Sequence, residues 1–398
     1  MPESPLLPVA EAQARLFAMA ATVAVENTPL RHAAGRWAAE PVHARRTQPA
    51  ADLSAMDGYA IRHADLPGPF RLIGESAAGH PFAGNVGAGE TVRISTGAAL
   101  PLGADTVLVQ EEARREGTLV HLDGDGPAHK RRNVRPRGLD FHDGDLLIDA
   151  GARITPARLA LAATAGLAAL PVRRPIRVAT LATGDELVPV DTPATGLQLP
   201  ESNTLMLAAL LADLPVELIE CGIVADSCDD LGLTFASLSA ATDLIVTTGG
   251  ASVGDHDLVR PALRAAGGSI DYWRIALRPG KPMLAGRLGG AVVLGLPGNP
   301  VSAFVTALLF VRPVIAAMAG AADPRPRTVT APLGEDLPAN GPRTDYLRAE
   351  LRDGRAFAST IQDSSMLATL ARAGCLIHRA PGAPAARAGE SVGILPLA

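Results

Sequence analysis

Apolar and polar residues alternate in two different ways in the first half of the chain. Residues 9–25 and residues 156–170 have the spacing of amphipathic helices. Between them, residues 46–138 contain short β-type runs, such as FRLIG, TVRIS, TVLVQEE and TLVHL, separated by Gly, Pro and Asp. This pattern predicts a β-rich domain at 46–138, inserted into a helical domain whose two halves are residues 1–45 and 139–174.

A third pattern begins at residue 175. The apolar runs RVATLA, VELIECGIV, DLIVTT and AVVLGL alternate with helix-like segments, which is typical of βαβ units around a parallel sheet. The segment ADPRPR after Ala321 is typical of a linker, and short β-type runs with Gly and Pro breaks follow it. We therefore predict a multidomain α/β plus β protein, with an α/β domain at 175–323 and a small β domain at 324–398.

Composition and charge narrow the function classes. A chain of 398 residues is too long for one hydrophobic core, and 47% hydrophobic with 19% charged residues is globular. The net charge of -5 gives no general reason to expect nucleic-acid binding. Among the 36 basic residues only Lys130 and Lys281 are lysines, so a lysine in this chain is a stronger functional candidate than usual.

Cysteine usage and hydropathy indicate the compartment. Cys221, Cys228 and Cys375 are too irregularly spaced for a disulfide framework or a C-x-x-C metal site, which suggests reduced thiols. The N-terminus lacks the basic start and apolar core of a signal peptide. The most apolar stretch, residues 301–320, is interrupted by Arg312 and reads as a buried helix. We therefore expect a cytoplasmic protein that does not enter a membrane.

The loops after three predicted strands carry unusual residues. Ligands of open α/β sheets bind beyond the carboxyl ends of the strands. The residues at these positions are Thr183, Gly184 and Glu186 in ATGDEL; Gly249, Gly250, Ser252 and Asp257 in GGASVGDHD; and Asn299 and Pro300 in PGNPVSAF. Taken singly, each loop is more often an ordinary turn or helix start. Taken together, they favour a phosphate-bearing ligand with a divalent cation.

Two parts of this constellation have a specific chemistry. Asn299 is a natural N-cap and Pro300 suits the first helical position, so the amides behind them are expected to form an anion site. Magnesium prefers carboxylate and phosphate oxygens, and Glu186, Asp226 and Asp257 are the candidate carboxylates. A lone aspartate in the position of Asp226 is more often a helix cap.

Basic residues precede the third loop, in YWRIALRPGKPMLAG. Lys281 stands in a tight Pro-Gly-Lys-Pro turn, where its ammonium can meet an oxyanion as a point charge. Arg274 and Arg278 can reinforce a positive pocket. A solvated surface lysine is the alternative, which the scarcity of lysine disfavours.

Several motifs occur in a fixed order: LSAMDGYAIR, RISTGAALPLGADTVLVQEE, RPRGLDFHDGD, LATGDELV, ESNTLML, TTGGASVGDHD, RPGKP and GLPGNPVSAF. In these motifs the chain resembles the molybdopterin molybdenumtransferase family, which includes the gephyrin E domain, from roughly residue 10 to the C-terminus. ATGDEL and GGASVGDHD are shared with the smaller molybdopterin adenylyltransferases and with competence/damage-type proteins. MDGYA and the STGA segment belong to the longer family.

The resemblance implies a fold and an activity. The expected fold is a helical domain, an inserted β domain, an α/β domain of the molybdopterin-binding type and a C-terminal β barrel. The expected enzyme inserts molybdate into adenylyl-molybdopterin with magnesium and releases AMP. It acts as a homodimer, with each active site between the α/β domain of one subunit and the first two domains of the other.

The resemblance also implies site residues. Catalytic roles fall on Asp57, Thr96, Asp140, Glu186, Asp226, Asp257 and Lys281, of which Glu186, Asp226 and Asp257 are the expected metal ligands. Substrate-binding roles fall on Thr183, Gly184, Ser202, Asn203, Gly249, Gly250, Ser252, Arg274, Arg278, Pro297, Gly298, Asn299 and Pro300. His256 matches no functional histidine of the family and is interpreted as a bystander.

Departures and alternatives are few. Arg274 and Arg278 stand where many members have lysine, which keeps the charge and changes its geometry, and Ala251 replaces a larger residue. A molybdopterin adenylyltransferase is disfavoured by the extra domains. A gephyrin-like scaffold would tolerate loss of the acids, all of which are present. Candidate protein partners are a molybdopterin adenylyltransferase and recipient molybdoenzymes.

Overall fold

The computed structural model describes residues 6–250 and 258–397. Its largest unit is built on a six-stranded sheet. In spatial order the strands are β16 (Val216–Val224), β13 (Ile176–Thr183), β17 (Leu244–Thr248), β21 (Ala291–Leu296), β20 (Pro282–Leu288) and β18 (Ser269–Arg274). The first four are parallel, as predicted. Strand β20 is antiparallel to both of its neighbours, β21 and β18, and the short Gly289–Gly290 connection makes β20 and β21 a hairpin.

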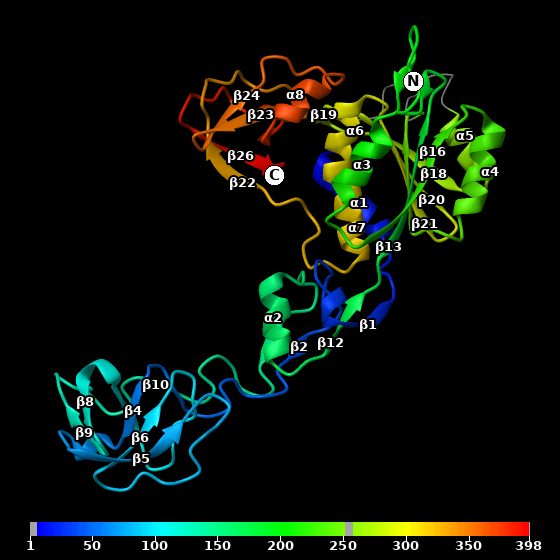
Figure 1. Cartoon of the computed structure of the whole chain (residues 1–398). Helices are drawn as coiled ribbons and strands as arrows, with labels where there is room; N and C mark the ends of the chain where they lie inside the picture. Colours follow the sequence, from blue (N-terminus) through cyan, green and yellow to red (C-terminus); the bar gives the residue numbers. More distant parts are fainter. Residues whose placement is uncertain (1–5, 251–257, 398) are drawn as a thin grey trace.

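Helices cover both faces of this sheet (Figure 1). The helices of one face are α1 (Val9–Met19), α3 (Asn203–Leu211), α6 (Pro300–Thr306) and α7 (Arg312–Met318), and those of the other are α4 (Cys228–Leu238) and α5 (Val259–Ala265). Successive strand residues point to opposite faces, so Val178 and Val246 pack with the first group while Ala179 and Ile245 pack with the second. The strands are apolar on both sides because both faces are covered.

One continuous helical segment spans Pro300–Met318 through α6, a π-helical turn (Ala307–Val311) and α7. It is long and apolar enough to cross a membrane, and 78% of its most apolar window is buried inside the protein. The segment is a core helix, as the sequence predicted.

Helix α1 lies elsewhere than predicted. Residues 9–25 were assigned to a helical domain together with α2 (Pro156–Thr164), but Ala12 and Leu16 of α1 are buried in the core of the α/β unit. Gln13 Nε2 donates to Leu309 O at 2.8 Å. An amphipathic pattern shows that a helix has an apolar face, but it does not show what that face packs against.

The remainder of the expected helical domain contains α2 and two strand pairs. These pairs are β1 (Val25–Pro29) with β12 (Ala169–Arg173), and β2 (Val42–His43) with β11 (Leu146–Ile148). A short 3-10 turn at Leu30–His32 belongs to this region, and two more, at His63–Asp65 and Gln110–Glu112, lie in the inserted region. The two halves of this region meet by strand pairing, although they lie more than a hundred residues apart in the sequence.

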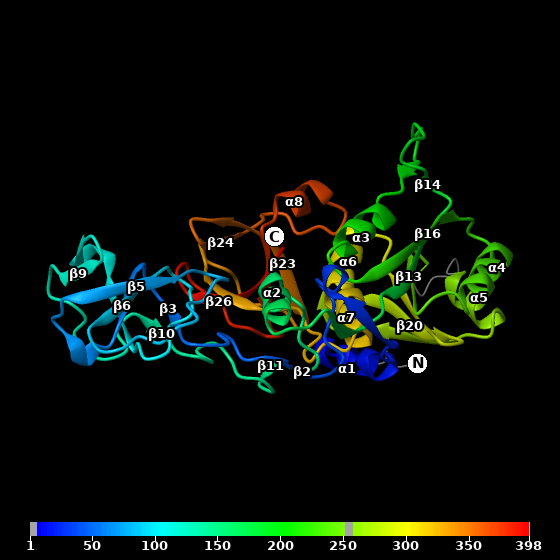
Figure 2. The ribbon, with the colours of Figure 1, turned by 60° about the horizontal axis from the view of Figure 1, so that its bottom comes forward.

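The inserted β region stands apart from the rest of the molecule in Figure 1, and Figure 2 shows it at the end opposite to α4 and α5. The strands of its sheet, in spatial order, are β7 (Thr106–Val109), β4 (Gly58–Ile61), β6 (Glu90–Ile94), β5 (Phe70–Ser76), β9 (Leu119–Leu122) and β8 (Ala113–Glu116). Strands β3 (Leu53–Ser54) and β10 (Val134–Arg135) pair beside it. The sheet has its own buried core, which includes Ile94 and Phe70.

The C-terminal unit is a small barrel. Its elements are β22 (Val329–Pro332), β23 (Thr344–Arg352), β24 (Arg355–Ala358), α8 (Leu367–Arg372), β25 (Cys375–Arg379) and β26 (Ser391–Pro396). Strand pairing runs from β24 through β23, β25 and β26 to β22, and the bridge between Leu333 and Ala356 closes the ring. Strand β19 (Leu277–Arg278) of the α/β unit pairs with β23. The predicted fold class is confirmed, whereas the residue boundaries of the domains stay a prediction.

Asp243 anchors the connection between the helical region and the α/β sheet. Its carboxylate accepts hydrogen bonds from Arg174 Nη1 and Nη2 at 2.7 and 2.8 Å, and from Arg177 N at 2.9 Å. Burial opposes the charged form, but the hydrogen bonds from Arg174 and Arg177 outweigh it and hold the pKa of Asp243 well below its usual range.

We expect Asp243→Asn to lower the free energy of unfolding at pH 7 by about 2 kcal/mol, because hydrogen bonds to a charged acceptor are lost. The folded pKa is depressed, so this contribution is complete above the unfolded pKa of about 4 and is lost as the pH falls toward the folded value. Urea titrations at pH 7 and at lower pH measure the difference, with the exposed Asp191→Asn as control. A difference that persists unchanged through acid pH would contradict the role of the charge.

Candidate functional site

A cavity of about 900 Å³ opens at the carboxyl ends of β13, β17 and β21. Twelve of the predicted site residues line it: Thr183, Gly184, Glu186, Ser202, Asn203, Asp226, Gly249, Gly250, Pro297, Gly298, Asn299 and Pro300. The parallel strands bring these loops together because they all end at the same edge of the sheet.

Glycine lets the strand-end loops approach each other closely. Gly249 has φ +88°, and a Cβ atom added there would lie 2.2 Å from Thr183 O. A Cβ atom at Gly298 would lie 3.6 Å from Gly249 Cα. Asn203 Nδ2, at the start of α3, donates to Gly298 O at 2.8 Å. The cavity floor is therefore backbone packed against backbone, which leaves room for a ligand above it.

Two of the predicted carboxylates face this cavity. Asp226 follows β16, and its Oδ1 accepts a hydrogen bond from Thr183 Oγ1 at 3.1 Å. The Glu186 carboxylate lies over Gly184, since a Cβ atom at Gly184 would stand 2.6 Å from Glu186 Oε2. Glu186 is exposed and Asp226 is half-buried, so both remain available to a ligand.

The donor set suits magnesium. Magnesium is usually held by one or two carboxylates together with substrate phosphates and water, and Glu186 and Asp226 supply hard oxygen ligands of this kind. Within residues 6–250 and 258–397, no group of three Asp, Glu, His or Cys side chains gathers at one point. The third predicted ligand, Asp257, lies outside the described residues, as does Ser252.

Sequence reasoning missed Glu201. This carboxylate lines the cavity although its residue is only 7% exposed. It accepts hydrogen bonds from Asn203 N at 2.7 Å and Thr204 N at 3.0 Å, and also from the Thr204 hydroxyl. Glu201 thereby satisfies the first amides of α3 and orients Asn203. An acid placed just before an apolar run is a local signal that can reveal such a cap.

The C-terminal barrel supplies a further wall of the cavity, through Ser365 and Leu367. Asn299 Nδ2 donates to Ser364 Oγ at 3.1 Å, and Val301 N donates to Ser364 O at 3.1 Å. No local sequence signal predicts these contacts. They also correct an expectation: the Val301 amide, predicted to face an anion, is occupied by a loop of another domain.

Of the predicted cations, Arg274 ends β18, and Arg278 and Lys281 lie between β18 and β20. None of the three lines the cavity, although Pro282, the first residue of β20, does. Arg278 forms an ion pair with Asp345 of the barrel, whose side chain is 5% exposed. Among the described residues, Lys281 has no ion pair or side-chain hydrogen bond. The backbone carbonyl of Arg274 accepts a hydrogen bond from Leu7 N at 2.8 Å.

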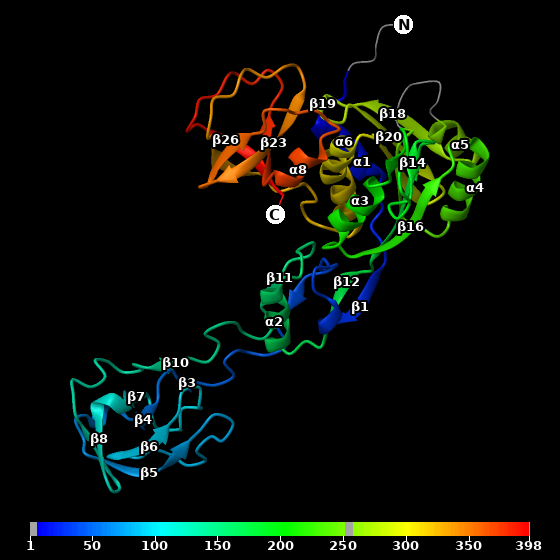
Figure 3. The same cartoon turned by 45° about the horizontal axis from the view of Figure 1, so that its top comes forward.

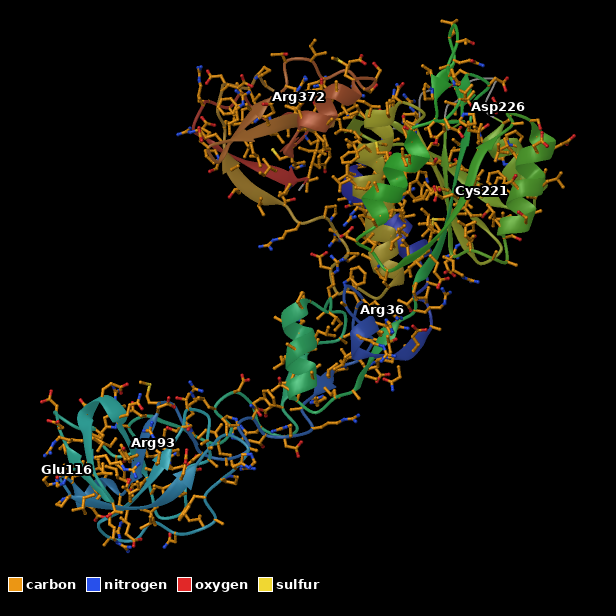
Figure 4. The ribbon with its side chains drawn as sticks, in the orientation of Figure 1. Arg36, Arg93, Glu116, Cys221, Asp226 and Arg372 are labelled. Atoms are coloured by element: carbon orange, nitrogen blue, oxygen red, sulfur yellow. The ribbon has the colours of Figure 1, made fainter. Side chains whose placement is uncertain are left out.

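Three predicted catalytic residues lie far from the cavity of the same chain. Asp57 Oδ1 accepts hydrogen bonds from Thr96 N at 2.6 Å and Thr96 Oγ1 at 2.9 Å, and these bonds lower the pKa of the exposed Asp57 carboxyl. Asp140 is exposed on the connection back from the inserted region. Figures 1 and 3 show the inserted region at the end of the molecule remote from the α/β sheet, and Figure 4 shows its Arg93 far from Asp226.

Comparisons with known proteins account for nearly all of the chain. Residues 7–166 match the family model of the MoeA N-terminal region (domain I and II), residues 179–317 that of a probable molybdopterin binding domain, and residues 330–397 that of the MoeA C-terminal region (domain IV). The fold and the site thus define a multidomain protein with an α/β domain of the molybdopterin-binding type.

Curated relatives and solved structures agree. The chain is 38% identical to the molybdopterin molybdenumtransferase of Haemophilus influenzae over 74% of this chain and 73% of the relative. It is 31% identical to that of Staphylococcus aureus strain MRSA252 over 98% and 95%. A crystal structure of the molybdopterin biosynthesis moeA protein from Pyrococcus horikoshii OT3 superposes with a TM-score of 0.84 at 26% identity, covering 98% and 99%. The chain belongs to the molybdopterin molybdenumtransferase family, which confirms the resemblance stated above.

Proposed function

We propose that this protein inserts molybdate into adenylyl-molybdopterin and releases AMP. The observation that carries the proposal is the cavity at the carboxyl ends of β13, β17 and β21, where a glycine-built floor lies beside Glu186 and Asp226. The test is whether the purified protein converts adenylyl-molybdopterin and molybdate to AMP and an active cofactor. An adenylyltransferase would instead consume ATP and molybdopterin, and a scaffold would do neither.

The cavity residues divide the work of binding. Gly249 and Gly298 line the cavity and carry no side chain, which lets a ligand approach the backbone closely. Ser202 and Asn203 at the start of α3 add polar contacts. Glu186 and Asp226 would hold magnesium through carboxylate oxygens. Magnesium at this position would supply polarisation of the phosphate link and offset the charge on the departing AMP.

Molybdate binding is assigned to the basic connection before β20. Arg278 is already paired with Asp345, which leaves Lys281 as a cation that the described residues do not neutralise. The ammonium of Lys281 meets the oxyanion as a compact point charge, with Arg274 as a second candidate. No covalent enzyme intermediate is required.

Replacement of Lys281 tests this assignment. We expect Lys281→Ala to raise the molybdate concentration for half-maximal AMP release by about tenfold or more, because a charge-assisted contact is lost. Lys281→Arg is also impaired, since a planar fork replaces the compact ammonium. The matched control is Lys130→Ala, because Lys130 pairs with Asp105 in the inserted region at 3.4 Å. An unchanged molybdate requirement in Lys281→Ala removes Lys281 from the site.

The complete active site is proposed to require two subunits. The inserted region, which carries Asp57 and Thr96, lies remote from the α/β sheet of its own chain (Figure 1). We propose that these residues and Asp140 instead face the cavity of a partner copy in a homodimer, as the family resemblance implies. The exposed Asp57 carboxylate, already oriented by Thr96, is then available to the ligand. We assign the enzyme to the cytoplasm. A molybdopterin adenylyltransferase and recipient molybdoenzymes stay candidate partners.

A further inference from the structure

The loop between β24 and α8 links the barrel to the cavity. Residues 361–367 leave the barrel, and Ser364 packs on the start of α6 through Asn299 and the amide of Val301. The next residues, Ser365 and Leu367, line the cavity. This loop has no regular secondary structure before α8, so its backbone carbonyls need partners outside a helix or sheet.

A single buried arginine supplies many of these partners. Arg348 on β23 is only 1% exposed. Its guanidinium donates to Gln362 Oε1 at 3.2 Å, Asp363 O at 2.8 Å, Met366 O at 3.4 Å and Ile361 O at 3.5 Å. In turn, Gln362 Nε2 donates a hydrogen bond to Arg348 O at 3.0 Å. All four acceptors of the guanidinium are uncharged oxygens of the loop.

Burying a charged guanidinium costs free energy unless hydrogen bonds compensate for the lost hydration. The hydrogen bonds from Arg348 to the loop supply this compensation. Arginine presents five donors in a rigid fork, which lets one side chain hold several carbonyls that point in different directions. Lysine has a single nitrogen and would hold fewer of them. The guanidinium of Arg348 therefore holds the loop in its shape through hydrogen bonds to the loop oxygens.

We propose that Arg348 is a positioning residue of the active site, which holds residues 361–366 so that Ser365 and Leu367 complete the wall against which adenylyl-molybdopterin binds. The inference rests on the proposed function for the identity of the ligand. Arg348 itself does not touch the ligand.

The barrel provides a matched control. Arg379 on β25 is also buried, with 7% exposure, and it also donates to loop carbonyls, those of Pro338 at 3.1 Å and Pro384. Neither proline lines the cavity. Arg379→Lys therefore reproduces the loss of a buried guanidinium from the same barrel without disturbing the cavity wall.

The first measurement is steady-state AMP release by full-length Arg348→Lys and Arg379→Lys proteins. We expect the KM for adenylyl-molybdopterin to rise by about fivefold or more in Arg348→Lys, with a smaller change in kcat, because ground-state binding is weakened. Arg379→Lys keeps the wild-type KM. Leu367→Ala, which removes an exposed wall residue outside the barrel core, should raise KM in the same direction without lowering the unfolding temperature.

The second measurement does not depend on the substrate. Hydrogen exchange of the Val301 amide, which donates to Ser364 O, should accelerate in Arg348→Lys and not in Arg379→Lys. Equal exchange in the two variants, or an unchanged KM in both Arg348→Lys and Leu367→Ala, overturns the inference while leaving the proposed function intact. Absence of AMP release by the wild-type protein overturns the proposed function, and the exchange measurement then still decides whether Arg348 holds the loop.

Discussion

Glu186→Ala and Asp226→Ala are each expected to lower AMP release by about 100-fold or more while the protein remains folded. Both carboxylates line the cavity, and Glu186 is exposed, so neither contributes much to the core. Their loss removes the oxygen ligands that place magnesium beside the phosphate link, and the leaving AMP is then poorly stabilised.

The measurement combines AMP release with thermal unfolding of each purified variant. The control is Asp191→Ala, an exposed acid in the segment after β14 (Leu187–Val188) that does not line the cavity. It should keep wild-type activity and unfolding temperature. Full activity of Glu186→Ala or Asp226→Ala would exclude that carboxylate from the site. Unfolding of a variant at room temperature would show instead that its role is structural.

The second large effect concerns the dimer. A heterodimer of one Asp57→Ala chain and one Glu186→Ala chain is expected to have about half of wild-type activity, although each homodimer is inactive. If each site takes Asp57 from one subunit and Glu186 from the other, this heterodimer contains one doubly damaged site and one intact site. The separation of the inserted region from the α/β sheet within one chain motivates the expectation (Figure 3).

The reciprocal heterodimer is the control. One chain carries both Asp57→Ala and Glu186→Ala, and its partner is wild type. A shared site then leaves one lesion in each site and almost no activity, whereas a site within one chain leaves one site intact and half of the activity. The two architectures therefore predict opposite results for the two heterodimers, which co-expression with two affinity tags can isolate for the AMP assay.

The strand-end loops are the part of the site that sequence patterns predict well. Thr183, Gly249 and Pro297 directly follow apolar runs, and the parallel pairing of β13, β17 and β21 brings them to one edge. The resemblance to a family added Ser202 and Asn203, whose place at the start of α3 also lies on the cavity. These residues are predictable because strand ends and turn glycines are encoded within a few neighbouring positions.

Contacts between distant segments were not predictable in the same way. The sequence pattern predicts that Arg278 binds an oxyanion, yet its guanidinium forms an ion pair with Asp345 of the barrel. The sequence pattern predicts an anion site at the amides behind Asn299 and Pro300, yet the Val301 amide donates a hydrogen bond to Ser364 O. In each case a residue more than sixty positions away in the sequence supplies the partner, and no local pattern indicates which side chains meet across a domain boundary.

The sequence by itself determined the local elements, the glycine-rich strand ends, the acids placed after them and the membership of a family. Only the tertiary structure decided that α1 packs on the α/β unit, that Ser365 and Leu367 of the barrel line the cavity, and that the inserted region stands far from the α/β sheet in one chain. The physical reason is the range of the interactions. Backbone propensity and turn geometry act over a few residues, whereas burial and hydrogen bonding between domains depend on surfaces that exist only once each domain has folded.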